Sequence, residues 1–203
     1  MNGSNAPFGL KPTRMIDGSP WNGGTSRYLI ASAYATSLYV GDPVTLLSDG
    51  TIGIGVAGSP IIGVFLGVKY QTSAGAVFPG GLGGFGAAYW PASTALATGT
   101  VAEAAVCDNP NVLFEIQSNT SAGVTTTGLN LNYNFVSAAG SNVTGISAYA
   151  LNVSSGSSTV DNLNLKALRF PQYPGNLSGV GYNVVECVIN NHQLKGGRGT
   201  TGA

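Results

Sequence analysis

Charge is what this sequence has least of. Only 8% of its 203 residues are charged, against about 25% in an ordinary soluble domain, and eight lysines and arginines balance eight aspartates and glutamates. A neutral chain gains little from counterion release on a phosphate backbone, so we expect no nucleic-acid partner. A surface with few charges also opposes association only weakly. The composition therefore favours a protein that assembles with other proteins.

Cysteine and histidine are scarce as well. Cys107 and Cys187 are too far apart for a zinc site, and each lies in a segment typical of a strand. This favours buried free thiols, and a disulfide stays open only if the two strands are neighbours. The single histidine, His192, is expected at the surface at the end of a strand, and the eight acids lie singly along the chain. We therefore expect no enzyme activity, no metal and no cofactor.

Long apolar runs and helical periods are missing too. The longest apolar run, residues 60–68, contains two glycines and is far shorter than the roughly 20 residues that span a bilayer. The first residues, MNGSNAPFGLKP, lack the cationic start and apolar centre of a secretory signal. We therefore expect neither membrane insertion nor export. Gly, Pro or Asn interrupts nearly every window long enough for three helical turns, so strands must supply the order.

Alternation of apolar and polar residues predicts an all-β fold. In residues 129–135, Leu129, Leu131, Tyr133 and Phe135 share one face and asparagines occupy the other, as in a half-buried strand. Further short strands are predicted at residues 27–31, 43–47, 51–56, 61–70, 101–107, 112–117, 145–153, 160–170 and 182–190. Many short strands separated by turns favour a jelly-roll-like sandwich or barrel over a parallel sheet.

Three stretches stand outside this pattern. Residues 1–26, rich in glycine and proline, are predicted to be an extended N-terminal arm ahead of a single β domain over residues 27–191. Residues 72–87 form a glycine-rich loop around FPGGLGGFG, and loops of this length are usually functional or disordered. Residues 192–203 are predicted to be a flexible C-terminal tail, ordered only by a partner. Residues 81–86 match GxGxxG, but no strand precedes them directly, so we expect no dinucleotide site.

The candidate partner-binding residues lie in the arm, the loop and the tail. The apolar residues of the arm are too far apart to form a core of their own, so we expect them to bind grooves on another chain. The full set is Phe8, Leu10, Arg14, Met15, Ile16, Trp21, Phe78, Phe85, Lys195 and Arg198.

A series of motifs in fixed order runs along nearly the whole chain. The first half holds NAPFGLKP (residues 5–12), DGSPWNG (17–23), YVGDPVTL (39–46), IIGVFLGVKY (61–70) and YWPAST (89–94). The second half holds DNPNVLFEIQ (108–117), GLNLN (128–132) and NVVECVINNHQ (183–193). This ordered series resembles the capsid cement, or head decoration, proteins of tailed bacteriophages. FPGGLGGFG is not part of the family pattern.

The resemblance implies a structural protein of the virion, made in the host bacterial cytoplasm and placed on the outer surface of the capsid. Its partners would be the major capsid protein, whose neighbouring subunits it clamps, and a second copy of itself. A homodimer is favoured because two-fold assemblies are the commonest, and a trimer is the second choice. The alternative is a head fibre or carbohydrate-binding adhesin on the virion surface, in which Phe78, Phe85, Tyr89 and Trp90 would form an aromatic platform.

Overall fold

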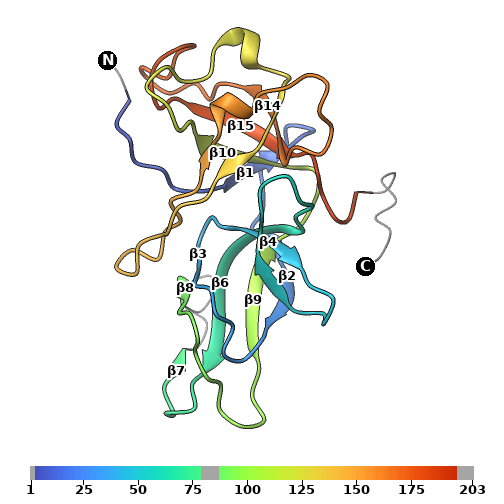
Figure 1. Ribbon diagram of the computed structural model, residues 1–203, viewed down its shortest axis with the longest axis vertical. Helices are drawn as coiled ribbons and strands as arrows, with labels where there is room; N and C mark the ends of the chain where they lie inside the picture. The colour runs from blue at the N-terminus through green and yellow to red at the C-terminus, as the bar shows by residue number, and fades with distance from the viewer. Residues whose placement is uncertain (1–2, 79–86, 196–203) are drawn as a thin grey trace.

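The computed structural model describes residues 3–78 and 87–195. Apart from two short 3₁₀ turns, Thr126–Gly128 and Val153–Ser155, its regular elements are strands, and every ladder between them is antiparallel. The all-β prediction is therefore confirmed, and the described strands form open sheets with no closed barrel. Two lobes are stacked along the long axis of the molecule (Figure 1).

The upper lobe in Figure 1 holds a five-stranded sheet. Its strands, in spatial order, are β1 (Lys11–Met15), β10 (Val112–Gln117), β15 (Val184–Ile189), β14 (Leu165–Arg169) and β11 (Asn132–Tyr133). The inner face of this sheet buries Phe114, Ile116, Leu165 and Cys187 in one apolar cluster. A short pair, β12 (Phe135–Val136) with β13 (Ala150–Leu151), contributes Phe135 and Leu151 to the same cluster.

The lower lobe is built on a second, six-stranded sheet with its own core. Its strands are β2 (Ser26–Ile30), β9 (Ala102–Cys107), β6 (Gly63–Gln71), β4 (Pro43–Leu46) and β5 (Ile52–Ile54), with β7 (Val77–Phe78) added at the end of β6. The separate pair β3 (Leu38–Tyr39) and β8 (Tyr89–Trp90) places Leu38 and Trp90 in that core. The sheet curls so that Leu29 of β2 forms a single parallel bridge with Thr51, the residue just before β5, but the sheet does not close.

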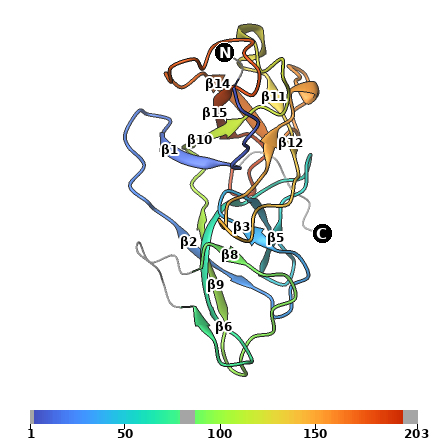
Figure 2. The same cartoon turned by 90° about the vertical axis from the view of Figure 1, so that its left-hand side faces the viewer.

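The lower lobe is an insertion in the upper sheet. Strands β1 and β10 are neighbours at Met15 and Val112, and the chain between them enters and leaves the lower lobe through the paired strands β2 and β9. The two connections can be followed in Figure 2. Side chains also tie the lobes together, since the Asn164 amide bonds the backbone of Gly58 and Ser59 and the Gln193 amide bonds both backbone groups of Leu46.

The predicted strands over residues 112–117, 101–107, 61–70 and 182–190 are found with shifts of a few residues at most. The alternating segment at residues 129–135 buries Tyr133 and Phe135 as predicted, but it divides between β11 and β12 because the chain changes sheet at Asn134. Residues 145–153 form only the two-residue strand β13.

The prediction that residues 1–26 form an arm outside the sheet is wrong for its central part. Residues 11–15 are strand β1, paired along β10, and Leu10 is only 1% exposed. Before β1, the Ala6 amide donates to the Gln117 side chain and the Gly9 amide to the Tyr149 carbonyl. A segment without local periodicity can still be a strand when a distant partner supplies its ladder.

Candidate functional site

The residues predicted to bind a partner are dispersed over the molecule. Leu10 lies in the core of the upper lobe, and Phe8, Met15 and Trp21 are half-buried. Ile16, at 55% exposure, is the one large hydrophobic side chain that is exposed among residues 3–26 of the described chain. Lys195 is exposed at the end of the described chain, and Phe85 and Arg198 lie outside the described residues.

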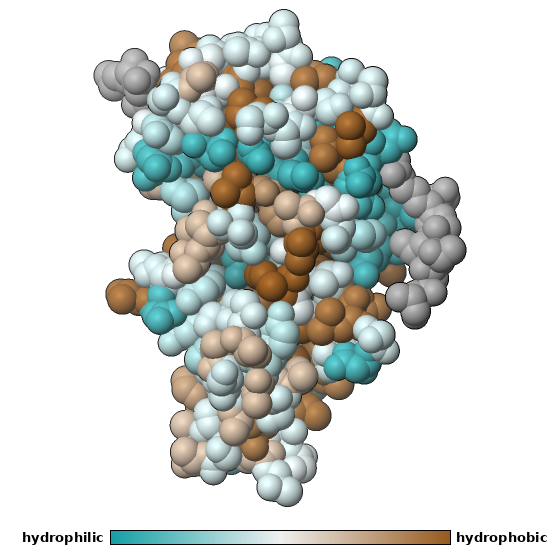
Figure 3. Space-filling view, viewed as in Figure 1, coloured by the Kyte–Doolittle hydropathy of each residue, from teal (hydrophilic) through white to brown (hydrophobic). Residues whose placement is uncertain are grey.

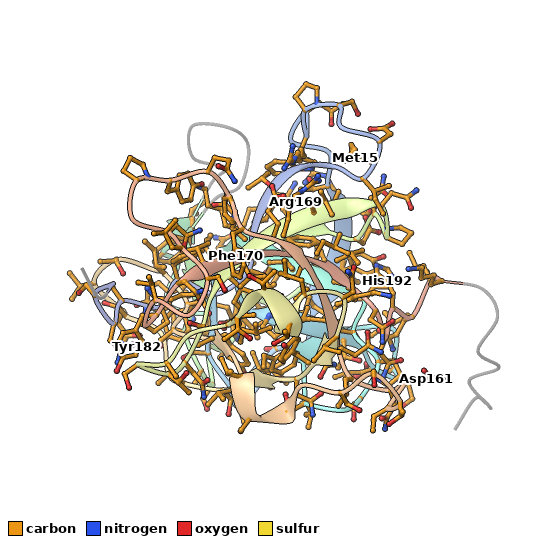
Figure 4. All side chains as sticks on the ribbon, turned by 90° about the horizontal axis from the view of Figure 1, so that it is seen from above. Met15, Asp161, Arg169, Phe170, Tyr182 and His192 are labelled. Atoms are coloured by element: carbon orange, nitrogen blue, oxygen red, sulfur yellow. The ribbon has the colours of Figure 1, made fainter. Side chains whose placement is uncertain are left out.

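Arg14, predicted to bind a partner, forms its hydrogen bonds within the chain. Its Nε and terminal nitrogen donate to the two carboxylate oxygens of Glu186 at 2.9 and 2.6 Å, and Arg169 Nε donates to Glu186 Oε2 at 2.5 Å. Figure 4 shows Arg169 on the same side of the upper lobe as Met15, the last residue of β1. Burial alone would raise the pKa of Glu186, but hydrogen bonds from Arg14 and Arg169 outweigh it and hold the pKa below its ordinary value. Arg14 therefore joins β1 to the sheet.

The acids are not all isolated, contrary to the expectation from sequence. Glu115 and Glu186 are directly opposite each other on β10 and β15, at 5% and 3% exposure. Tyr173 donates its hydroxyl to Glu115 at 2.5 Å, and this bond raises the pKa of Tyr173 to about 12. Like charges opposite each other on neighbouring strands repel, and the two arginines bound to Glu186 and the tyrosine bound to Glu115 offset this repulsion on the outer face of the sheet.

His192 is buried, and the expectation of a surface position is wrong. It is 6% exposed (labelled in Figure 4), and its Nδ1 accepts the Leu194 amide at 3.0 Å. Burial lowers its pKa, so the imidazole is neutral near pH 7. The backbone of its neighbour Asn191 accepts the Ile61 amide, so the closing NNHQ motif fastens the upper lobe to the lower one.

Both cysteines are free and fully buried, as predicted. Burial raises the pKa of the Cys107 thiol to about 12 and that of Cys187 further. Within residues 3–78 and 87–195, no three His, Cys, Asp or Glu side chains are grouped so that they could hold a metal ion.

Apolar side chains gather at the free end of the lower lobe. Val77, Phe78 and Val101 are 59%, 38% and 54% exposed and line a hollow of about 270 Å³ with Lys69 and Tyr70. Phe78 stacks on Tyr70 with ring centroids 4.5 Å apart. We call Val77, Phe78 and Val101 the lower apolar patch. In Figure 3 the surface of the lower lobe is mostly of intermediate hydropathy, with hydrophobic residues exposed in places.

The aromatic platform of the adhesin alternative does not assemble. Trp90 is 0% exposed in the core of the lower lobe, and Tyr89 stacks on Tyr39 at 5.6 Å. Phe78 packs on Tyr70 instead. Tyr89 and Trp90 therefore serve the fold, because β8 directs Trp90 inward, whereas Phe78 stays 38% exposed as part of the lower apolar patch.

Two further hollows were not predicted from the sequence. One, of about 390 Å³, lies between Tyr39, Asp42 and Ile54 of the lower lobe and Tyr149 of the upper lobe. The Asp42-Pro43 corner expected from YVGDPVTL is present, with Gly41 at φ +99°, but the corner also buries the Asp42 carboxylate to 1% exposure. The other hollow surrounds Trp21. A Trp within a run of Asn, Gly and Ser is the one sequence signal that could have indicated it.

The chain matches no protein-family description, no curated protein and no solved structure. The ordered motifs are thus the basis of the resemblance given above. Among the described residues, none of the helical segments has the length and apolar character needed to cross a bilayer.

Proposed function

We propose that this protein is a capsid cement protein, which binds the outer surface of a tailed-bacteriophage head and clamps neighbouring shell subunits. The observation that carries the proposal is the lower apolar patch, which lies at the free end of the lower lobe on a chain in which only 8% of the residues are charged. Exposed apolar side chains grouped in this way are typical of a protein-binding surface. The order of the motifs supports the same function.

The shortage of charge is greater in the folded protein than in the sequence. Arg27 and Lys69 both pair with Glu103, and Arg14 and Arg169 both pair with Glu186. Four of the eight cationic side chains are thus bound within the chain. Attachment through the remaining surface is apolar and hydrogen-bonded, so we expect it to withstand high salt.

Two stacked lobes suit a protein that touches two neighbours at once. The upper lobe exposes Ile16, Tyr173 and Leu177, at 55%, 47% and 64%, while the lower lobe exposes its apolar patch. When one chain holds two subunits, the second contact becomes intramolecular, and avidity can exceed single-site affinity by about 100-fold or more. A homodimer on a two-fold axis of the shell, with a trimer as the second choice, would multiply the effect further.

The test is co-sedimentation with shells of the cognate phage that lack this protein. Wild-type protein should sediment with the shells in both low and high salt. The double variant V77S/V101S should bind at least about tenfold more weakly, because it replaces two apolar side chains that would be buried against the shell. Val143→Ser is the matched control, since Val143 is 95% exposed and lies on a different loop.

Equal binding by V77S/V101S and wild type would exclude the lower apolar patch as the contact. Absence of the protein from purified virions, measured by mass spectrometry, would refute the proposal as a whole. Deletion of residues 1–26 is not a usable test of attachment, because it removes β1 and Leu10 and so disturbs the fold itself.

A further inference from the structure

A hollow of about 360 Å³ lies between the two connections that join the lobes. One wall is the segment between β1 and β2, with Trp21 and Asn22, and the other is the turn between β9 and β10, with Asp108 and Asn109. Figure 2 shows these two connections running between the lobes. Its volume falls within the range of small-molecule sites, about 300–1,000 Å³.

The residues that line the hollow include apolar side chains and one aromatic ring. Trp21 is half-buried and packs in part against the core of the upper lobe, as does Met15. Val112 of β10, at 1% exposure, also lines the hollow. The indole is thus held by the fold, and a bound ligand would not have to order it.

The rim carries amide donors whose partners are missing within the described chain. Asn22 Oδ1 accepts the Gly24 amide at 3.1 Å, and Asn109 Oδ1 accepts the Asn111 amide at 2.9 Å. Each asparagine therefore uses its oxygen in a turn, and its Nδ2 makes no hydrogen bond to residues 3–78 or 87–195. These turns fix the orientation of both amide groups at the rim.

Acceptors lie beside these donors. Asp108 accepts the Tyr28 hydroxyl at Oδ2, at 2.8 Å, and its Oδ1 has no side-chain partner in the described ranges. Thr25 and Ser26, each with a hydroxyl group, also line the hollow. The lining thus combines hydrogen-bond donors and acceptors with the Trp21 ring, and the Asp108 carboxylate is the single charged group among these residues.

We propose that this hollow binds one pyranose ring of a neutral glycan. A sugar ring has an apolar C–H face that packs on an indole, and its adjacent hydroxyls both donate and accept hydrogen bonds, which matches this rim. A phosphate or nucleotide does not fit, because no cation lines the site and Asp108 would repel it. The glycan site goes beyond the proposed cement function and does not rest on it.

Tryptophan fluorescence is the direct measurement. The chain has two tryptophans, and Trp90 is 0% exposed, so a ligand-dependent change reports Trp21. The probes are the trisaccharides of N-acetylglucosamine, glucose in α and β linkage, and mannose, together with a proline-rich peptide. We expect a saturable change with at least one trisaccharide at millimolar concentration, and amide NMR shifts confined to residues 20–26 and 108–112.

Two conservative variants separate binding from folding. Asn22→Asp and Asn109→Asp keep the oxygen that accepts the turn hydrogen bond but replace the free Nδ2 donor with an acceptor. Each should weaken sugar binding at least tenfold with an unchanged melting temperature. Asn142→Asp is the control, because Asn142 Oδ1 likewise accepts a hydrogen bond, from Tyr39, on a different loop, and this variant should bind like the wild type.

Three results would overturn the inference. The first is the absence of a saturable signal with every trisaccharide at tens of millimolar. The second is unchanged affinity in both Asn22→Asp and Asn109→Asp. The third is saturation by the proline-rich peptide alone, which would assign the hollow to a protein partner. Shell binding measured by sedimentation is a separate readout, so either function can fail without the other.

Discussion

Replacing Asp42 by asparagine tests the physical chemistry of the junction between the lobes. The Asp42 carboxylate is 1% exposed, and its Oδ2 accepts the Tyr39 amide at 2.8 Å. Its Oδ1 has no hydrogen-bond partner that meets ordinary geometry among the described residues. Burial raises the pKa of Asp42 from 3.8 to about 6. The Ser147 side chain and the Tyr39 amide both favour the charged carboxylate, but they offset only part of this rise. Asparagine has the same shape and stays neutral at every pH.

The sign and size of the effect follow from this pKa. A folded-state pKa above that of the unfolded chain means that the folded state holds the proton more tightly. The resulting stability is fully present below about pH 4 and is lost as the pH rises through about 6. A shift of about two units corresponds to about 3 kcal/mol, at roughly 1.4 kcal/mol per unit. Relative to Asp42→Asn, the wild type should therefore lose about 2–3 kcal/mol of unfolding free energy between pH 4 and pH 7.

Urea unfolding of both proteins from pH 4 to pH 8 measures this difference directly. Contributions from His192, Glu186 and the other titrating groups cancel, because both proteins contain them. Asp49→Asn is the control: hydrogen bonds from Thr51 lower the pKa of exposed Asp49, so the trend should be weak and of opposite sign. A difference between wild type and Asp42→Asn that does not change with pH would refute the reasoning, as would an Asp42 pKa near 4 measured by carbon NMR.

Three further outcomes follow from the packing. Leu10→Ala should lower the free energy of unfolding by about 2–5 kcal/mol in urea titrations, because Leu10 is a core side chain, whereas a smaller loss than 1 kcal/mol would support a free arm. Gly9→Ala should lower the melting temperature of the protein far more than Gly18→Ala. Both glycines have a positive φ. A Cβ at Gly9, however, would lie 2.4 Å from the Gly41 carbonyl oxygen, whereas a Cβ at Gly18 would have no neighbour within 4 Å. Cys107 and Cys187 should react with a thiol reagent only after unfolding, and rapid labelling of the native protein would contradict their burial.

The agreement between sequence and structure is best where the pattern is local. The strand at residues 112–117 was predicted with its observed bounds, because a buried strand bounded by the turn at residues 108–110 shows its whole character within ten residues. The free, buried thiols were predicted for the same reason, since each cysteine stands in an apolar strand. The corner at Gly41 and Asp42 likewise follows from residue types that favour turns.

The candidate sites were predicted less well, because each depends on segments far apart in the chain. Trp21 lies over the turn that contains Asn109, and the two meet only because β1 pairs with β10 and β2 with β9. Only the adhesin alternative required Trp90 at the surface, and the pairing of β8 with β3 directs this residue into the core.

By itself, the sequence determined the class of fold, the shortage of charge and the positions of most strands, because side-chain alternation and composition are local properties. Only the tertiary structure decided that residues 11–15 are part of the sheet, that Glu115 and Glu186 face each other, and that the chain forms two lobes. The physical reason is that ladder hydrogen bonds are made by backbone groups common to all residues, so which distant strands pair is settled by the packing of the whole chain.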